Sequence, residues 1–491
     1  MRASGILLPV ASLPSRYGIG CFSKEAYEFV DRLEEAGQSY WQILPLGPTG
    51  YGDSPYQSFS TFAGNPYFID LETLVKEGLL TEEECDACDF GDNAEYIDYE
   101  KIYLSRFKVL RKAFERFAAD DVYDAFVSEN GYWLEDYALY MAIKDALGGI
   151  SWSEWPAELK DREEAALNQK REELAEEIAF YKFQQFIFLK QWKALKAYAN
   201  EKGIRIIGDI PIYVAFDSAD TWANPVLFQF DEDNQPKAVA GCPPDAFSAT
   251  GQLWGNPLYK WDYHKSTGYA WWLLRLAHVF KLYDTVRIDH FRGFEAYWAV
   301  PAGEKTAMKG KWKKGPGEEL FRAIEKALGE ELPIFAEDLG IITPEVEKLR
   351  DSLGYPGMKV LQFGFDGLGE SSFLPHQLDT RNCICYTGTH DNDTTLGWYQ
   401  HTAHQNQDKV RRYMNTDASS ISWDFIRVCL GTIARYAIFP VQDLLNQGSE
   451  HRMNTPGTAA GNWEYRFRAG LLNEGMAKGL RQMTELFGRF G

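Results

Sequence analysis

Carboxylates end three strand-like segments of the sequence. Asp289 follows the first apolar run, Glu337 the second and Asp391 the third. Charged residues that directly follow a buried strand lie at the carboxyl edge of a sheet, where parallel barrels build their active sites. The three segments therefore predict a single site lined by carboxylates.

Two of these carboxylates are suited to breaking a glycosidic bond. A retaining mechanism needs one ionised carboxylate as nucleophile and a second, protonated carboxyl as general acid. Asp289 is flanked by Arg287 and His290, and nearby positive charge favours the ionised form of a carboxylate. Glu337 follows the apolar residues 334–336, and an apolar setting raises the pKa of a carboxyl group. The pattern predicts Asp289 as nucleophile and Glu337 as proton donor.

Asp391 is the third member of the set. We expect it to orient the sugar hydroxyls beside the reacting carbon and to stabilise the positive charge that develops there. For any one of the three carboxylates, a structural salt bridge at a strand end is the simpler explanation. Three of them at one predicted rim count against that explanation for the set.

Aromatic, amide and hydroxyl side chains are concentrated in two Gly-rich loops. The loop 48–57 contains Tyr56, and the loop 245–256 contains Phe247 and Trp254. Sugars present C–H faces that stack on aromatic rings, and hydroxyls that need donors and acceptors. Packing is the simpler role for a single aromatic residue, but these loops lack the periodicity that would bury one face. The two loops therefore indicate a carbohydrate site.

Eight strand-like runs organise the chain. They lie at 5–11, 40–46, 204–214, 285–291, 332–338, 357–365, 382–389 and 435–442. Their nearly continuous apolar character is typical of strands covered on both faces, as in a parallel sheet. Helical patterns lie between most of them, for example at 24–36, 318–328 and 343–353. Eight strands that alternate with helices predict a (β/α)₈ barrel, with a doubly wound open sheet as the alternative.

Two long interruptions depart from the minimal barrel, which we expect to form one catalytic unit over residues 1–491. Residues 69–167, between the second and third strands, predict a mostly helical insertion subdomain. Residues 216–261, after the third strand, are rich in Gly, Pro, Asp and aromatic residues and show little periodicity. A loop of that length is usually functional. We therefore expect an active-site loop insertion at 216–261.

The composition favours a neutral ligand and a reducing compartment. With 51 Lys and Arg against 71 Asp and Glu, the formal charge of −20 disfavours nucleic acid and anionic membranes as partners. The 7 cysteines are an odd number in a long chain and do not indicate a disulfide framework. Cys85 and Cys88 lack the second pair or the histidines that a structural zinc site needs. We expect no metal and no cofactor.

Targeting and membrane signals are weak. The N-terminal apolar run is short and is soon interrupted by Pro9, which does not fit a signal peptide. The apolar stretch 269–280 is interrupted by Arg275 and His278, and no stretch reaches the length of a transmembrane helix. We therefore expect a cytoplasmic protein.

Six segments together resemble the amylomaltases, the bacterial 4-α-glucanotransferases. They are Pro45-Leu-Gly-Pro-Thr-Gly-Tyr-Gly-Asp-Ser-Pro-Tyr-Gln, Gly208-Asp-Ile-Pro-Ile-Tyr-Val, Arg287-Ile-Asp-His-Phe-Arg-Gly, Ala336-Glu-Asp-Leu-Gly, Tyr386-Thr-Gly-Thr-His-Asp-Asn-Asp-Thr and Arg452-Met-Asn. The resemblance covers nearly the whole chain. It implies a cytoplasmic enzyme that cleaves an α-1,4-glucan, holds the donor segment covalently and passes it to the 4-hydroxyl of a second glucan.

The resemblance also implies roles for individual residues. It gives Asp289 as nucleophile, Glu337 as acid/base and Asp391 as transition-state stabiliser, which agrees with the interpretation from the residues. It implies sugar contacts from Ser54, Tyr56, Asp209, Trp254, Arg287, His290, Asp366 and His390. Phe247 remains a candidate stacking face, although Ala246 stands where some relatives carry tyrosine.

Two alternative functions remain open at this point. One is an α-1,4-glucan hydrolase of the α-amylase type, in which water replaces the acceptor. The other is a non-catalytic glucan-binding scaffold. The presence of all three carboxylates argues against a scaffold, because a scaffold needs no catalytic acid. In each case α-1,4-glucans and malto-oligosaccharides are the expected partners.

Overall fold

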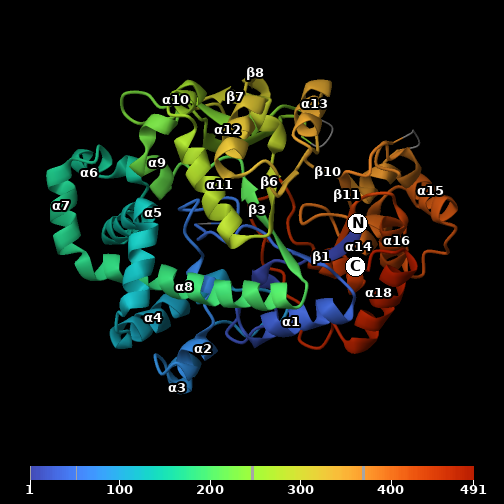
Figure 1. Ribbon diagram of the computed structural model, residues 1–491, viewed down its shortest axis with the longest axis horizontal. Coiled ribbons are helices and arrows are strands. Elements are labelled where there is room, and N and C mark those ends of the chain that lie inside the picture. The colour runs from blue at the N-terminus through green and yellow to red at the C-terminus, as the bar shows by residue number, and fades with distance from the viewer. Residues whose placement is uncertain (1, 51, 245–247, 368–370, 491) are drawn as a thin grey trace.

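Eight parallel strands form the central sheet of the computed structural model, which describes residues 2–50, 52–244, 248–367 and 371–490 (Figure 1). Along the sheet the strands follow the order β10-β11-β12-β1-β2-β3-β6-β9. Their bounds are Ala3–Leu7 (β1), Tyr40–Gln42 (β2), Arg205–Pro211 (β3), Thr285–Asp289 (β6), Ile334–Ala336 (β9), Gly357–Val360 (β10), Cys383–Tyr386 (β11) and Tyr436–Pro440 (β12). Each of the eight predicted runs overlaps one of these strands.

The sheet closes into a barrel between β9 and β10. The backbone N–H of Ala336 donates to the carbonyl of Pro356 at 3.0 Å. Asp338 Oδ1 accepts from the N–H of Met358 at 2.7 Å, and Arg350 binds the other oxygen of Asp338. The predicted (β/α)₈ barrel is therefore confirmed, and the open-sheet alternative is wrong because the two edges of the sheet meet at this seam.

Helices surround the barrel (Figure 1). In α12 the buried residues Leu320, Phe321 and Ile324 lie on one face of the helix, as expected for a helix that covers a sheet. The helices outside the two insertions are α1 (Lys24–Glu35), α8 (Ala175–Glu201), α11 (Ala270–Leu282), α12 (Glu318–Leu328), α13 (Pro344–Ser352), α14 (Thr395–His401), α15 (His404–Met414), α16 (Ile421–Gly431), α17 (Val441–Leu444) and α18 (Glu474–Leu486).

The chain between β2 and β3 forms further helices, which gather on one side of the barrel (Figure 1). The side chains of Asp98 and Asp120 accept hydrogen bonds from the first turns of α4 and α5, so each helix starts at a capped residue. α5 packs against α8, which leads back to the barrel. These helices are α2 (Leu71–Lys76), α3 (Glu82–Asp86), α4 (Tyr99–Arg116), α5 (Asp121–Ala146), α6 (Ala157–Lys160) and α7 (Glu164–Glu173).

A buried ion pair joins this helical region to the segment after β3. The ammonium group of Lys144, near the end of α5, donates to Asp217 Oδ2 at 2.6 Å. The side chain of Lys144 is 6% exposed and that of Asp217 is 32% exposed, so loss of Asp217 would leave a buried ammonium group without its carboxylate partner. Nearby, the N–H of Ala219 donates to the carbonyl of Phe59 at 2.8 Å. The helices thus brace the loop that carries Tyr56.

The segment 216–261 is more regular than its sequence predicts. It contains α9 (Ala219–Ala223), β4 (Ala238–Cys242) and β5 (Gln252–Pro257), and α10 (Trp261–Ser266) follows it. β4 and β5 join β7 (Ala296–Pro301) and β8 (Lys311–Lys314) in an antiparallel sheet of order β5-β4-β7-β8. The sequence predicts none of these strands, because Gly241 and Gly255 interrupt the first two and every residue of β8 is at least partly exposed.

The structure also bears on membrane-spanning helices and on free cysteine thiols. In the described ranges, no helix combines the length and apolar character needed to cross a bilayer. Free thiols are carried by Cys21, Cys85, Cys88, Cys383, Cys385 and Cys429.

Candidate active site

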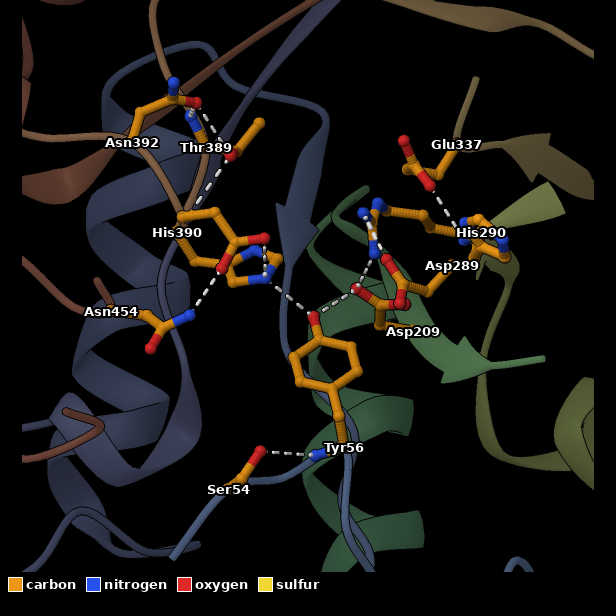
Figure 2. A network of polar contacts seen from close by, with 12 residues as sticks. Ser54, Tyr56, Asp209, Asp289, His290, Glu337, Thr389, His390, Asn392 and Asn454 are labelled. Atoms are coloured by element: carbon orange, nitrogen blue, oxygen red, sulfur yellow. Dashed lines mark hydrogen bonds and ion pairs between the residues drawn. The ribbon is translucent and has the colours of Figure 1, made fainter. Parts of the chain in front are cut away.

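Arg287 binds two carboxylates at the carboxyl ends of neighbouring strands. Its NH1 donates to Asp209 Oδ2 at 2.6 Å, and its NH2 donates to Asp289 Oδ1 at 2.8 Å. β3 and β6 pair so that Asp209 lies beside Arg287 and Pro211 lies beside Asp289. Residues two apart on a strand face the same side. Strand register therefore places both carboxylates within reach of one guanidinium, as their positions in Figure 2 show.

Burial strengthens the interaction between Arg287 and its two carboxylate partners. The side chains of Asp209 and Arg287 are 0% and 4% exposed, whereas that of Asp289 is 30% exposed. Burial raises the pKa of Asp209, and the charge of Arg287 opposes that rise. Burial lowers the pKa of Arg287, but Asp209 and Asp289 together hold it well above its usual value. The guanidinium is therefore a fixed positive charge beside Asp289.

Glu337 follows β9 and faces the end of β6 (Figure 2). Its Oε2 accepts from the backbone N–H of His290 at 2.7 Å, and its Oε1 accepts from the N–H of Leu339 at 2.7 Å. His290 has a left-handed backbone with φ +54°, which is uncommon for a residue other than glycine. Burial and then the charge of Asp289 raise the pKa of Glu337. This carboxyl group therefore favours its protonated form.

A chain of polar contacts leads from Asp209 through Tyr56 to His390 (Figure 2) and continues to Asp391. Tyr56 OH donates to Asp209 Oδ2 at 2.9 Å and lies 3.0 Å from His390 Nε2. His390 Nε2 lies 3.4 Å from Asp391 Oδ2. Burial lowers the pKa of His390, which favours the neutral ring. Because Tyr56 donates its single proton to Asp209, the hydrogen between Tyr56 and His390 belongs to Nε2.

Asp391 is fixed by two residues near the C-terminal end of the chain. Asn454 Nδ2 donates to Asp391 Oδ1 at 2.7 Å, and Arg452 NH2 donates to the Asp391 carbonyl at 2.6 Å. The side chain of Asp391 is still 44% exposed, so it remains open to a ligand. Neither residue follows a strand-like run, so their positions in the sequence do not predict a place in the site. In the sequence, only the resemblance of residues 452–454 to the amylomaltases points to them.

Trp254 and His290 meet on the other side of the site. The indole ring of Trp254 lies edge-on to the His290 ring, with centroids 4.7 Å apart and an interplanar angle of 86°. Burial lowers the pKa of His290 to about 3, so this ring is neutral at physiological pH. Trp254 lies on β5, within the segment that the sequence predicts to be an active-site loop.

Three buried polar atoms at this site have no hydrogen-bond partner among the described residues. They are Asp209 Oδ1, Tyr213 OH and His290 Nε2. Asp209 and Tyr213 also line a cavity of about 590 Å³ that includes open solvent. Buried polar atoms without a partner are rare in proteins, so each of these atoms marks a place where a water molecule or a ligand group is expected. Tyr213 was not predicted from the sequence, where it reads as one more aromatic residue after β3.

Three further residues, Ser54, Asp366 and Phe247, were predicted to contact sugars. Ser54 Oγ accepts from the backbone N–H of Tyr56 at 3.3 Å and so helps to fix that residue (Figure 2). Asp366, after β10, is exposed and interacts with Trp398. It makes no hydrogen bond to the other site residues that the structure describes. Phe247 lies outside the described residues.

The acidic neighbours of the site have structural partners. Asp338 bridges the barrel seam, and Asp393 Oδ2 accepts from Ser449 Oγ at 2.6 Å. Over the part of the chain that the structure describes, no group of three or more His, Cys, Asp or Glu side chains is arranged to hold a metal ion. The expectation of a reaction without metal or cofactor stays a prediction.

Known proteins resemble this chain over its whole length. Residues 8–472 match the family profile described as 4-alpha-glucanotransferase. The 4-alpha-glucanotransferase of Thermus thermophilus is 50% identical over 497 residues, which cover 99% of this chain and 98% of the relative. The chain belongs to the 4-alpha-glucanotransferase family. The family's member from Clostridium butyricum is 48% identical and covers 98% of this chain and 99% of its own.

A solved structure gives the same result. The amylomaltase from Streptococcus agalactiae, in complex with acarbose, has a TM-score of 0.97 and 43% identity, with 100% of both chains covered. The predicted resemblance to the amylomaltases is confirmed. The 4-alpha-glucanotransferase activity is favoured over the two alternatives, an α-amylase-type hydrolase and a non-catalytic scaffold.

The effect of Asp289 on Glu337 can be measured directly. In Asp289→Asn, the negative charge beside Glu337 is lost, so the ionised form of Glu337 becomes easier to form and its pKa falls. Titration of ¹³C-labelled glutamate carboxyls by NMR should show this decrease. Asp417→Asn is the control. It changes an exposed residue that is remote from Glu337 in the sequence, and it should leave the titration of Glu337 unchanged. An unchanged pKa in Asp289→Asn would contradict the electrostatic coupling.

Proposed function

We propose that this 4-alpha-glucanotransferase works by double displacement on Asp289. In this proposal an oxygen of Asp289 attacks the anomeric carbon of a bound α-1,4-glucan, and the glycosidic bond to the leaving segment breaks. The observation that carries the proposal is the contrast between the two carboxylates. Asp289 pairs with the buried cation Arg287, while Glu337 is buried without a cation at hydrogen-bond distance among the described residues.

Glu337 then serves both steps as the proton carrier. In the first step its carboxyl proton goes to the glycosidic oxygen of the leaving segment. In the second step the resulting carboxylate takes the proton from the 4-hydroxyl of the acceptor, whose oxygen attacks the anomeric carbon and releases Asp289. The raised pKa of Glu337 supports this role, because burial and the charge of Asp289 outweigh the two backbone N–H donors, which favour the ionised form. These donors fix the orientation of the carboxyl group.

The polar contacts around the nucleophile would hold the donor sugar. We assign Asp391 to the ring hydroxyls nearest the reacting carbon, with His390, Tyr56, Asp209 and Arg287 as its partners in the network. The unpartnered Nε2 of His290 is suited to a further hydroxyl, and the Trp254 ring to a C–H face. Acarbose, a sugar-like ligand, is bound by the related amylomaltase from Streptococcus agalactiae. Ser54, Phe247 and Asp366 remain proposed contacts on the sequence resemblance.

Composition and thiol content support a proposal about the biological setting. We propose that the enzyme acts on malto-oligosaccharides and other α-1,4-glucans in carbohydrate metabolism, in the cytoplasm and without nucleic-acid or membrane partners. The net charge of −20 supports neutral substrates, and the free thiols support a reducing compartment. We also propose 69–167 as the helical insertion subdomain and 216–261 as the active-site insertion of a single catalytic unit of residues 1–491.

A covalent adduct tests the assignment of the nucleophile. Glu337→Gln should lower turnover of maltotriose by about 10²–10⁴-fold, because the leaving sugar is no longer protonated. A glycosyl fluoride needs no such protonation and should still load a glycosyl unit. Mass spectrometry of digested Glu337→Gln should then place the adduct on Asp289.

The double variant Glu337→Gln/Asp289→Asn is the control and should carry no adduct. An adduct on any other carboxylate would overturn the assignment of Asp289. Wild-type enzyme that converts maltotriose only to glucose and maltose, without longer dextrins, would instead contradict transfer itself.

A second prediction concerns the preference for an acceptor over water. We propose that β5 and the segment around it shield the glycosyl intermediate, because transfer to a dilute sugar depends on positioning that can contribute about 7–11 kcal/mol. Trp254→Ala should lower transfer more than hydrolysis, which raises the reducing sugar released per bond rearranged. The matched control is Leu253→Ala, an exposed neighbour on the opposite face of β5. Equal losses of both activities in Trp254→Ala would contradict the shielding role.

A further inference from the structure

An exposed tryptophan marks the edge of the antiparallel sheet. Trp312 lies on β8, the outermost strand, and is 40% exposed. Its cross-strand neighbour is Trp298 on β7, with ring centroids 5.1 Å apart in an edge-on arrangement. A single exposed aromatic ring is common on protein surfaces, so a role for Trp312 depends on its other contacts.

A buried arginine connects Trp312 to the active site. The guanidinium carbon of Arg292 lies 3.8 Å from the centroid of the Trp312 ring, so one face of the indole is occupied. The same guanidinium donates from NH1 to the carbonyl of Ile341. Arg292 follows Asp289 by three residues, and Ile341 follows Glu337 by four residues. Trp312 is thus tied to the ends of the two segments that carry the reacting carboxylates.

The contacts of Arg292 also fix the position of the Trp312 ring. Ile341 is 37% exposed, and the guanidinium of Arg292 binds its backbone carbonyl while it stacks on Trp312. Because Arg292 covers one face of the indole ring, the exposure of Trp312 comes from the rest of the ring. A guanidinium stacked on an aromatic ring restricts its rotation. The ring is therefore held in place for a ligand, and it loses little side-chain entropy when one binds.

The chemistry of the reaction indicates which part of the substrate would reach Trp312. A general acid lies beside the glycosidic oxygen, so the leaving segment and later the acceptor extend from the side of Glu337. Ile341 lies in the segment that follows Glu337, and Arg292 links its carbonyl to the Trp312 ring. In the described part of the chain, Trp312 makes no hydrogen bond to Asp289 or Glu337, so a sugar on its ring would lie beyond the sugar that reacts.

We propose that Trp312 is a binding residue for the distal sugars of long α-1,4-glucan acceptors, with its open indole surface stacked on the C–H face of a sugar ring. This inference rests on the proposed function, because it takes Glu337 as the acid/base. Glucose and maltose are too short to use the contact. A longer acceptor gains affinity from it and is selected over shorter ones.

The test separates the acceptor step from the donor step. A glycosyl fluoride loads the enzyme without a leaving sugar, and initial rates of transfer are then measured with glucose, maltose or maltoheptaose as acceptor. In Trp312→Ala, kcat/KM for maltoheptaose should fall about tenfold, which corresponds to about 1.4 kcal/mol. The value for glucose should stay within twofold of wild type. Trp312→Phe should retain most of the preference for maltoheptaose.

Lys313→Ala is the matched control, since Lys313 is the next residue on β8 and faces the opposite side of the strand. It should leave both acceptors unchanged. Equal losses for glucose and maltoheptaose in Trp312→Ala would mean that the ring only supports Arg292, and no loss would mean that it binds no sugar. Either result overturns the inference. Wild-type enzyme that transfers to no acceptor at all would contradict the proposed function instead.

Discussion

The buried guanidinium of Arg287 is the contact on which the rest of the site depends. It lies between Asp209 and Asp289, and it offsets the cost of placing these carboxylates at the end of a barrel. Removing it would leave Asp209 buried without a cation. It would also release Asp289, the group that we assign as nucleophile. One cation therefore serves both the folded structure and the proposed chemistry. A lysine has a single nitrogen and could not replace the two guanidinium nitrogens that bind separate carboxylates.

Strand pairing in the barrel places the carboxylates around Arg287. Parallel pairing of β3 and β6 sets Asp209 beside Arg287, and the seam held by Asp338 brings β9, and with it Glu337, to its place in the closed ring. Glu337 is the counterpart of Asp289, because its nearest donors are backbone N–H groups with no net charge. Two carboxylates on adjoining strands thus have opposite environments, and this difference is what an acid/base and a nucleophile need.

The barrel and the three carboxylates could be predicted from the sequence because apolar runs and the charges after them are local patterns. Asp289 ends β6, Glu337 directly follows β9, and Asp391 lies in the loop after β11. Contacts that depend on tertiary structure had no such signal, and Asn454 on Asp391 is the clearest case. β4, β5, β7 and β8 were missed because they pair with one another outside the barrel and β8 has no buried face.

Neutron diffraction from a deuterated crystal at neutral pH tests the central claim most directly, since it locates the protons on the carboxylates of the unliganded enzyme. Our account predicts deuterium on a carboxyl oxygen of Glu337, none on Asp289, and five deuterium atoms on the three guanidinium nitrogens of Arg287. Deuterium on Asp289 with Glu337 ionised would contradict the account, because the nucleophile and the acid would then have exchanged their states.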